Sequence, residues 1–409
     1  MGKVYVTGMG LVTALGIGVK ANRQGLVTGT SGIGYAKHLK SLLRDQFPAA
    51  EVDYSTNDLL QFVAHRGQLQ ESRLVLLAAI AIQEALESAS PFRLVDNPGH
   101  ATAPRTGFIN ATTVGGMADV EYEYEQMIDP QVPRISPHLG DSLDCAHGTE
   151  ELARHFGLTG FIGTVSTACS SSANAIMYGA RLIKGGILDR AICGGVDTLT
   201  RFTINGFNSL KNIDKNPCKP FDANRNGLNL GEGAAYLVLE SEESIRKSVQ
   251  KPLAQLSGYC NFNEAFHPTA PSPDGAGAYQ AMLGAIEQAG LQPADISCIN
   301  AHGTATINND IAEGHALQRL FGNQVPPFSS TKSFTGHTLA PSGAIEAIYS
   351  ILSILNNEIY PVLNFETPMP EIGLIPVTRL VTGAKNQHVL SNSFGFGGNN
   401  ASLLFSKYE

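Results

Sequence analysis

The sequence predicts an α/β fold, because short apolar runs typical of buried strands alternate with longer stretches of helical periodicity. In the first half, residues 73–88 have the pattern of an amphipathic helix and residues 190–195 that of a buried strand. The second half repeats the alternation, with a helix expected over 275–290, a strand over 296–301 and a helix over 343–355. Such alternation indicates βα units. At 409 residues, the chain can hold two conventional domains or one large duplicated unit.

Further elements follow from local signals along the chain. A strand is expected at 4–7 and a helix at 173–184, each from its apolar pattern. Prolines at 91, 98 and 104 predict a surface loop over 91–105. The polar, charged stretch 241–252 favours a boundary near residue 250, which would divide the chain into an N-terminal half, 1–250, and a C-terminal half, 251–409.

Composition bounds the functional class. Hydrophobic residues make up 43% and charged residues 16%, which predicts a globular chain. A net charge of −8 argues against a generic nucleic-acid binder, because phosphate recognition needs concentrated basic surface. No apolar run of membrane-spanning length and no signal-like N-terminus is found, so a cytoplasmic location is expected. Six cysteines without a Cys-x-x-Cys pair suit a reduced compartment.

One cysteine stands in a setting that favours chemistry. The segment Val165-Ser-Thr-Ala-Cys-Ser-Ser-Ser172 follows an apolar run and precedes the expected helix. A thiol on the first turn of a helix lies at the positive end of the helix dipole, which favours the thiolate. Cys169 is therefore a candidate nucleophile, although a small buried cysteine without function is an open alternative.

Two histidines occur in comparable positions, each among glycine and small polar residues after a strand-like run. His302 lies in Cys298-Ile-Asn-Ala-His-Gly-Thr-Ala-Thr306, and His337 ends Ser329-Ser-Thr-Lys-Ser-Phe-Thr-Gly-His337. A lone histidine of this kind is more often structural. A thiol together with two histidines on strand-to-turn junctions suits acyl transfer, in which one group attacks and the others handle charge or protons.

These motifs occur in the order seen in β-ketoacyl-acyl carrier protein synthases, which the chain resembles over nearly its whole length. The resemblance rests on Thr-Ala-Cys-Ser-Ser, Asn-Ala-His-Gly-Thr, Thr-Lys-Ser-Phe-Thr-Gly-His and Asn392-Ser-Phe-Gly-Phe-Gly-Gly-Asn399. It extends to the opening segment 4–13 and to 219–233. The resemblance implies the thiolase-like fold, with two pseudo-duplicated βαβαβαββ halves in five layers. It also implies decarboxylative Claisen condensation of an acyl-enzyme thioester with malonyl-acyl carrier protein, giving a 3-oxoacyl product.

The resemblance assigns roles to individual residues of this sequence. Cys169 would carry the acyl group, while His302 and His337 would donate hydrogen bonds to the enolate oxygen. Lys332 would support the site through Glu346, against the alternative of a simple surface lysine. Phe396 would gate the acyl pocket and present an oxyanion-hole amide together with that of Cys169, although glycine clusters such as 395–398 often form ordinary turns.

Substrate and partner contacts are also implied. Thr269, Thr304 and Thr306 would hydrogen-bond a pantetheine arm, unless they only cap local backbone. Lys211 aligns with a docking position for acyl carrier protein, with Arg66 and Arg73 as weaker candidates. No cofactor of its own is expected, because substrates arrive on the carrier's phosphopantetheine.

No metal site is expected. Asp310 and Glu313 with His302 or His315 match no strong zinc or iron spacing. The glycine pairs at 8 and 10 and at 115 and 116 complete no nucleotide fingerprint.

Two rival interpretations of the family predict different residues at the site. A thiolase would carry a second cysteine in a C-terminal glycine-rich motif, and this chain has no cysteine after Cys298. A noncatalytic chain-length factor would lack the active cysteine, and Cys169 is present. The segments 338–342 and 307–308 depart from the usual synthase pattern near the site. They leave open acyl-chain length and whether the pathway is fatty-acid or specialised polyene or polyketide synthesis. A homodimer is expected, with a heterodimer with a homologous partner as the alternative.

Overall fold

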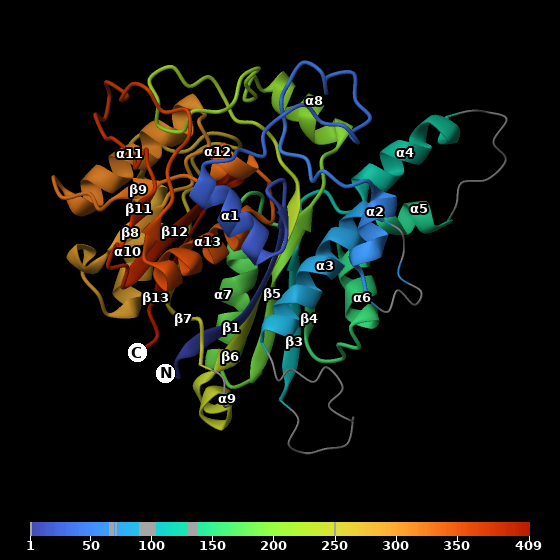
Figure 1. Ribbon diagram of the computed structural model, residues 1–409, viewed down its shortest axis with the longest axis horizontal. Coiled ribbons are helices and arrows are strands. Elements are labelled where there is room, and N and C mark those ends of the chain that lie inside the picture. The colour runs from blue at the N-terminus through green and yellow to red at the C-terminus, as the bar shows by residue number, and fades with distance from the viewer. Residues whose placement is uncertain (1, 65–68, 70–71, 90–103, 129–136, 249–250) are drawn as a thin grey trace.

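The computed structural model describes residues 2–64, 69, 72–89, 104–128, 137–248 and 251–409. Within these ranges the main sheet has 11 strands in the order β4-β3-β5-β6-β1-β7-β13-β12-β8-β9, with β2 paired to β1. Helices cover the sheet on its outer faces and also lie within the fold (Figure 1). The structure is therefore the mixed α/β architecture that the alternating sequence pattern predicts.

The strand order contains an internal duplication. The first half contributes β4 (Ile162–Val165), β3 (Thr106–Ala111), β5 (Arg190–Asp197), β6 (Gly233–Ser241) and β1 (Val4–Thr13). The second half contributes β9 (Phe328–Ser329), β8 (Cys298–Asn300), β12 (His388–Gly395), β13 (Asn399–Ser406) and β7 (Ala254–Asn263). In both halves the spatial order, counted along the chain, is third, second, fourth, fifth, first. The two five-stranded units join where β1 pairs antiparallel with β7.

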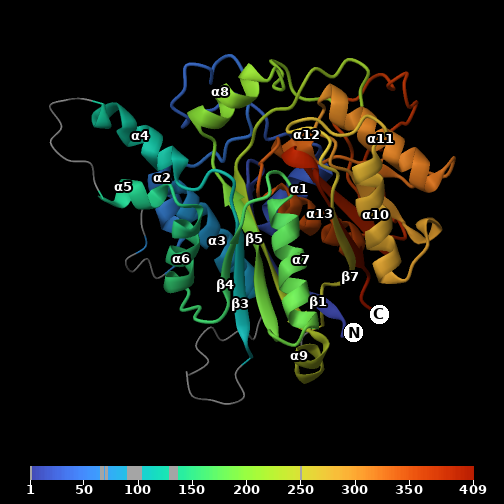
Figure 2. The ribbon, with the colours of Figure 1, turned by 180° about the vertical axis from the view of Figure 1, so that it is seen from behind.

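Helices complete five layers. α3 (Arg73–Ser88) packs on β1 and β6, on the outer face of the first unit. α10 (Ala276–Ala289) packs on β7 and β13, with α11 (Ile307–Phe321) beside it, on the outer face of the second unit. α7 (Ser171–Lys184) and α13 (Ser342–Asn356) contact each other and strands of both units, so they form the central layer (Figures 1 and 2). The thiolase-like fold is thereby confirmed.

Burial explains why the central helices differ from an ordinary amphipathic helix. In α13, all residues from Ser342 to Ile354 are buried, because strands lie on both sides of the helix. A helix that is apolar around its whole circumference is stable only in such an interior. Most of its buried apolar residues belong to the same core cluster as those of α7 and of strands β1, β5, β7 and β13.

The remaining elements lie around these layers. They are β2 (Gly16–Ile17), α1 (Val19–Thr28), α2 (Thr56–Leu59), α4 (Met117–Met127), α5 (Pro137–Ser142), α6 (Cys145–His155), α8 (Arg201–Ser209), α9 (Glu242–Lys247), α12 (Lys332–Thr335), β10 (Glu358–Ile359) and β11 (Val381–Thr382). Short 3-10 helices span Leu60–Phe62, Pro293–Asp295 and Phe396–Gly398. None of the helices in the described ranges has both the length and the apolar character needed to cross a bilayer.

The expected elements agree with those observed. The helix over 73–88 is α3, and the expected helices at 275–290 and 343–355 are α10 and α13, each within one residue at either end. The expected strands at 4–7 and 190–195 are the first parts of the longer β1 and β5, whereas that at 296–301 is the shorter β8. The expected loop over 91–105 lies outside the described residues except for its last two positions.

Candidate active site

Cys169 lies on a tight turn between β4 and α7. Ala168 has a positive φ of 54°, and the amide of Ser171 closes the turn by donating to the Ala168 carbonyl at 3.1 Å. Ser170 is the N-cap residue, so helix α7 begins two residues after the thiol. The prediction that Cys169 stands on the first helical turn is therefore wrong by two residues. The strained turn instead fixes the direction of a side chain that is only 5% exposed.

The acidity of the thiol also differs from the prediction. Burial raises the pKa of Cys169 to about 11, against the opposing effects of the Lys332 ammonium and of the backbone amides of Phe396 and Cys169. Desolvation therefore outweighs the positive surroundings, and the thiol is protonated at rest. The positive groups near the sulfur are nevertheless the ones that would stabilise negative charge developing there.

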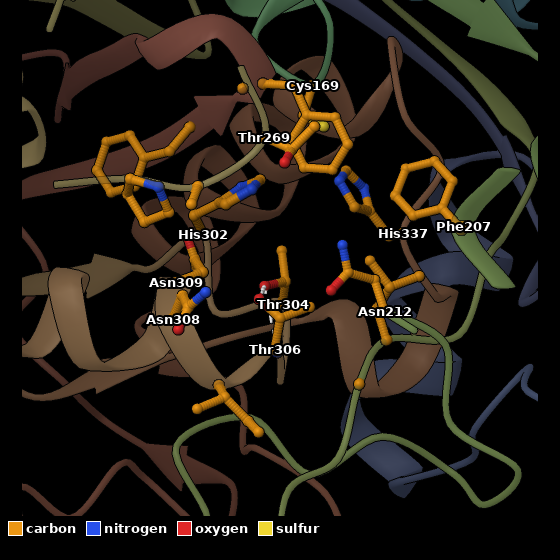
Figure 3. Close-up of a pocket in the computed structure, with 18 of the residues that line it drawn as sticks. Cys169, Phe207, Asn212, Thr269, His302, Thr304, Thr306, Asn308, Asn309 and His337 are labelled. Atoms are coloured by element: carbon orange, nitrogen blue, oxygen red, sulfur yellow. Dashed lines mark hydrogen bonds between the residues drawn. The ribbon is translucent and has the colours of Figure 1, made fainter. Parts of the chain in front are cut away.

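Both predicted histidines reach the same cavity as Cys169. His302 follows β8, His337 follows α12, and their side chains are 2% and 1% exposed. The ring centroids lie 5.4 Å apart at an interplanar angle of 85°. A nitrogen of each ring and the Cys169 sulfur lie within 4.8 Å of one another. Figure 3 shows the two imidazoles side by side below Cys169. Segments 133 and 168 residues distant from Cys169 in the sequence thus form one site.

Hydrogen bonds fix which nitrogen of each ring carries its proton. The Lys332 ammonium lies 3.2 Å from His302 Nδ1, and an ammonium can only donate. The backbone amide of Leu339 donates to His337 Nδ1 at 3.3 Å, with Ser342 Oγ 3.0 Å from the same nitrogen. Since both Nδ1 atoms accept, the neutral rings carry their protons on Nε2. Two N–H donors therefore become available to a group bound next to the thiol.

The imidazoles are held in the neutral form. Burial, the charge of Lys332 and the neighbouring His337 lower the pKa of His302 well below its usual value. Burial and Lys332 likewise lower the pKa of His337. Neutral rings with defined tautomers are suited to donate hydrogen bonds to an oxyanion, whereas they are weak bases.

Lys332 is a buried, paired lysine, as predicted. Its side chain is 2% exposed and forms an ion pair with Glu346, whose side chain is 3% exposed. An unpaired ammonium would be costly at this depth, so the Glu346 carboxylate makes the position of the amine possible. Burial raises the pKa of Glu346 to about 7, and the Lys332 ammonium acts in the opposite direction. Because the ammonium lies so close, it stabilises the ionised carboxylate of Glu346.

The turn that carries His302 is held by two acidic residues to which sequence reasoning gave no role. Glu313 accepts hydrogen bonds from the backbone amides of His302 and Gly303 at 2.9 and 2.8 Å. Asp310 accepts from those of Ala305 and Phe221. Both carboxylates are fully buried. Glu313 also accepts from the side-chain amide of Asn392, and Asp310 from that of Asn309, each at 3.0 Å. The sequence offered one signal for this role: the two acidic residues are three positions apart, as on one face of a helix, and they follow shortly after the His302 motif.

The loop after β12 places a backbone amide against the thiol. A Cβ on Gly395 would lie 3.0 Å from the Thr167 carbonyl oxygen and 3.2 Å from the Cys169 nitrogen, so any larger residue would force its neighbours to move by a few tenths of an ångström. The amide of Phe396 interacts with the Cys169 sulfur. The Phe396 ring stacks on Phe207 of α8, with centroids 5.6 Å apart and an angle of 23°. Phe207 is a further pocket residue that the sequence did not indicate.

A cavity of about 230 Å³ connects the three reactive side chains with the surface. Thr269, Thr304 and Thr306 line it, together with Asn212, Asn308 and Asn309, and Figure 3 shows Thr304 and Thr306 on the side opposite Cys169. Thr304 and Thr306 also bond each other through their hydroxyls at 2.9 Å. Lys211 lines the same cavity and is exposed. The predicted threonines and the predicted docking lysine therefore line the same pocket.

Arg73 is not available for docking, in contrast to the expectation. Its guanidinium is paired with Glu232, with exposed side-chain fractions of 12% and 1%, and donates to the carbonyls of Val52 and Tyr54. Its role is to anchor the segment around residue 52 to the start of α3. Arg66, the other weak docking candidate, lies outside the described residues.

The same three reactive side chains are the one group of potential metal ligands found in the described part of the chain. Two neutral imidazoles and a thiol could bind a soft divalent ion. The Lys332 ammonium, 3.2 Å from His302, opposes a second positive charge at this position. The absence of metal from the chemistry remains a prediction.

Comparisons with known proteins agree with this geometry. The N-terminal domain of β-ketoacyl synthases matches residues 1–244, and the C-terminal domain matches residues 253–366. A 3-oxoacyl-[acyl-carrier-protein] synthase 2 from Staphylococcus aureus (strain N315) is 33% identical over 100% of this chain and 99% of the relative. The chain belongs to the β-ketoacyl synthase family.

Two solved structures extend the comparison. The ishigamide ketosynthase/chain length factor superposes with a TM-score of 0.91 at 30% identity, covering 100% of both chains. A type II polyketide synthase acyl-carrier protein in complex with its ketosynthase bound to the hexaketide gives a TM-score of 0.87 at 25% identity, also over 100% of both chains. The similarity thus includes both halves of the fold.

Proposed function

We propose that the protein catalyses decarboxylative Claisen condensation of an acyl group, held on Cys169, with malonyl-acyl carrier protein. The observation that carries the proposal is the pair of Nε2–H donors beside a buried thiol, in a cavity that is also lined by Thr304, Thr306 and Lys211. Membership of the β-ketoacyl synthase family supports the same reaction. The enzyme is an acyltransferase of the 3-oxoacyl-[acyl-carrier-protein] synthase class.

The first half-reaction loads the enzyme. The Cys169 sulfur attacks the carbonyl carbon of an acyl thioester, and the pantetheine sulfur leaves with the proton that the cysteine loses. Because burial raises the pKa of the thiol to about 11, charge must be stabilised as the bond forms. The amides of Cys169 and Phe396 are suited to hold the carbonyl oxygen, and each such donor contributes several kcal/mol.

The second half-reaction forms the carbon–carbon bond. Loss of carbon dioxide from the malonyl thioester leaves an enolate whose oxygen accepts hydrogen bonds from His302 and His337. Its carbon attacks the acyl carbonyl on Cys169, the cysteine sulfur leaves and regains a proton, and a 3-oxoacyl chain two carbons longer results. Lys332 and Glu346 keep the His302 tautomer and do not touch the substrate.

The substrates would be delivered on the phosphopantetheine of acyl carrier protein, and the enzyme needs no cofactor of its own. The pantetheine arm would hydrogen-bond Thr269, Thr304 and Thr306 along the cavity. Lys211, which lines the cavity and is exposed, would contact the acidic carrier. Charge reversal, Lys211→Glu, should raise KM for the carrier substrate with little change in kcat, whereas Lys247→Glu at the distant α9 should not.

The protein would act as a homodimer in the cytoplasm. β4 ends the main sheet on one side, its residues are partly exposed, and Ile162 is 40% exposed, which offers an edge for pairing with a second copy. Pairing with a homologous chain-length factor is the alternative, since one similar structure is a ketosynthase/chain length factor. We further propose the division into halves 1–250 and 251–409, each with its own five-stranded unit.

The alternative functions are a noncatalytic chain-length-factor-like subunit and a thiolase. The convergence of Cys169, His302 and His337 favours a catalytic subunit, and Phe396 occupies the loop position where a thiolase would need its second cysteine.

One experiment tests both the reaction and the pathway, which is either fatty-acid synthesis or specialised polyene or polyketide synthesis. Purified protein is incubated with malonyl carrier and acyl carriers of graded length, and products are identified by mass. Formation of 3-oxoacyl carrier that Cys169→Ala abolishes supports the proposal, and unchanged product from that variant contradicts it.

A further inference from the structure

A network of three asparagines is hydrogen-bonded to the nucleophile turn. Asn399 Oδ1 accepts hydrogen bonds from Asn261 Nδ2 at 2.6 Å and Asn174 Nδ2 at 3.1 Å. Ser170 Oγ lies 3.1 Å from the same oxygen and shares its one proton between it and the Thr167 carbonyl at 2.8 Å. Asn261 Nδ2 also donates to Asn174 Oδ1 at 2.9 Å. One oxygen thus gathers donors from two separate segments of the chain, the start of α7 and strand β7.

These segments belong to both halves of the molecule. Ser170 is the neighbour of Cys169, and Asn174 lies one turn into α7, where its amide also donates to Thr167 Oγ1 at 2.9 Å. Asn261 lies on β7, and Asn399 is the first residue of β13. The asparagine network therefore joins the nucleophile turn of the first half to the loop that carries Phe396 in the second half.

The position of Asn399 in that loop is specific. β12 ends at Gly395 and β13 begins at Asn399, and these two residues pair across the base of the loop. Between them Gly397 and Gly398 have positive φ angles of 79° and 77°, and a Cβ on Gly397 would meet no atom within 4 Å. The loop is thus open around Gly397 but packed at Gly398, where a Cβ would lie 2.8 Å from Glu264 Cγ. The Gly397 amide donates to the Pro268 carbonyl at 2.8 Å, and Asn399 holds the residue that follows the two glycines.

From this arrangement we propose that Asn399 is a positioning residue, which pins the base of the Phe396 loop to the nucleophile turn. The pin keeps the amides of Cys169 and Phe396 in one relation to the sulfur while the Phe396 ring moves to admit an acyl chain. Asn399 does not line the cavity, so it acts through the loop and through Ser170. The inference rests on the proposed function, because it concerns how the same oxyanion site is kept intact.

The chemistry of the network defines the informative variants. All three contacts use the Asn399 oxygen as acceptor, so Asn399→Asp retains the acceptor and Asn399→Leu removes it at similar size. Asn386→Leu serves as a matched control. Asn386 is a buried asparagine, whereas Asn399 is partly buried, and it too makes several hydrogen bonds, but they go to Ser353 and the Glu358 carbonyl, away from the site.

The test compares two reactions of the same sulfur. Acylation by hexanoyl-N-acetylcysteamine needs an oxyanion site, whereas alkylation by iodoacetamide does not. In Asn399→Leu, we expect acylation to fall by about tenfold or more, with alkylation changed less than about threefold. Asn399→Asp should recover most of the acylation, and Asn386→Leu should show no such split. Equal loss of both reactions in Asn399→Leu, or no loss of acylation, would overturn the inference.

A second readout does not depend on activity. Hydrogen exchange of peptides covering residues 390–400 should be faster in Asn399→Leu than in the unaltered protein, and close to normal in Asn399→Asp and Asn386→Leu. An unchanged hydrogen-exchange rate in Asn399→Leu would contradict the positioning role of Asn399. This holds even if the unaltered protein proved unable to accept the acyl group. Failure of acylation in the unaltered protein would instead count against the proposed function.

Discussion

Cys169 and His337 occupy equivalent positions in the two halves of the duplicated fold. Each follows the third strand of its half and precedes the helix of the central layer, β4 and α7 for Cys169 and β9 and α13 for His337. Because α7 and α13 pack against each other, these two equivalent turns meet. The candidate site is therefore a consequence of the duplication, and neither half contains it alone.

The buried thiol predicts a steep pH dependence of its reactivity. With the pKa of Cys169 at about 11, the thiolate fraction rises about tenfold per pH unit throughout the range from about 7 to 10. Iodoacetamide alkylation of Cys169, followed by intact mass with Cys169→Ala as control, should rise accordingly. A rate that levels off near pH 8 would contradict the dominance of burial over the neighbouring positive groups.

The charge of Lys332 predicts the acid limit of the condensation. Burial and the charge of Lys332 lower the pKa of both histidines well below the ordinary value of 6.5. Both rings therefore stay neutral as the pH falls through 6.5, and the condensation rate should not fall at that pH. Removing the charge raises both pKa values, which moves the acid limb of the rate profile to higher pH. The double variant Lys332→Met/Glu346→Leu removes the ammonium without leaving a buried, unpaired carboxylate. An acid limb at the same pH in the double variant would exclude Lys332 as the cause.

The approach of Gly395 to the nucleophile predicts a selective loss of acyl transfer. A Cβ there would lie 3.0–3.3 Å from the Thr167 carbonyl oxygen and from the amides of Cys169 and Ser170, so the loop must shift. We expect Gly395→Ala to lower acylation by about 10²-fold, as for the loss of one oxyanion donor. The control is Gly206→Ala, where a Cβ meets no atom within 4 Å. Equal acylation rates in the two variants would contradict the proposed role of the Phe396 amide.

Glu313 predicts a combined effect on stability and site geometry. In Glu313→Gln, an NH₂ group replaces one of the two carboxylate oxygens that accept from the amides of His302 and Gly303. One of these buried amide donors is then left without an acceptor. The free energy of unfolding should fall by about 1–3 kcal/mol, as measured by urea denaturation. Condensation should fall further than acylation, because His302 moves and Cys169 does not. A loss of acylation as large as that of condensation would show a general disturbance instead.

The sequence predicted the elements and the reactive residues better than their electrostatics. Helices α3 and α13 and strand β5 follow from periodicity and apolar runs, and the motifs placed Cys169, His302 and His337 at the ends of elements. The raised pKa of Cys169 could not be predicted, because burial depends on segments such as Gly395 that are distant in the sequence. The pairing of Arg73 with Glu232 was missed for the same reason: an arginine at a helix start looks exposed until the fold covers it.

The central claim is that Cys169 carries the acyl group while His302 and His337 act on the malonyl unit. Its most direct test uses the unaltered protein, His302→Ala and His337→Ala, with His315→Ala as a surface control. Acyl carrier is added first and the intact mass of each protein is measured. Malonyl carrier is then added and the yield of 3-oxoacyl carrier is measured. We predict that all these proteins gain one acyl mass, and that His302→Ala and His337→Ala lose about 10²-fold or more of the condensation yield. Condensation at the unaltered rate in both histidine variants, or acyl mass retained after Cys169→Ala, would contradict the account.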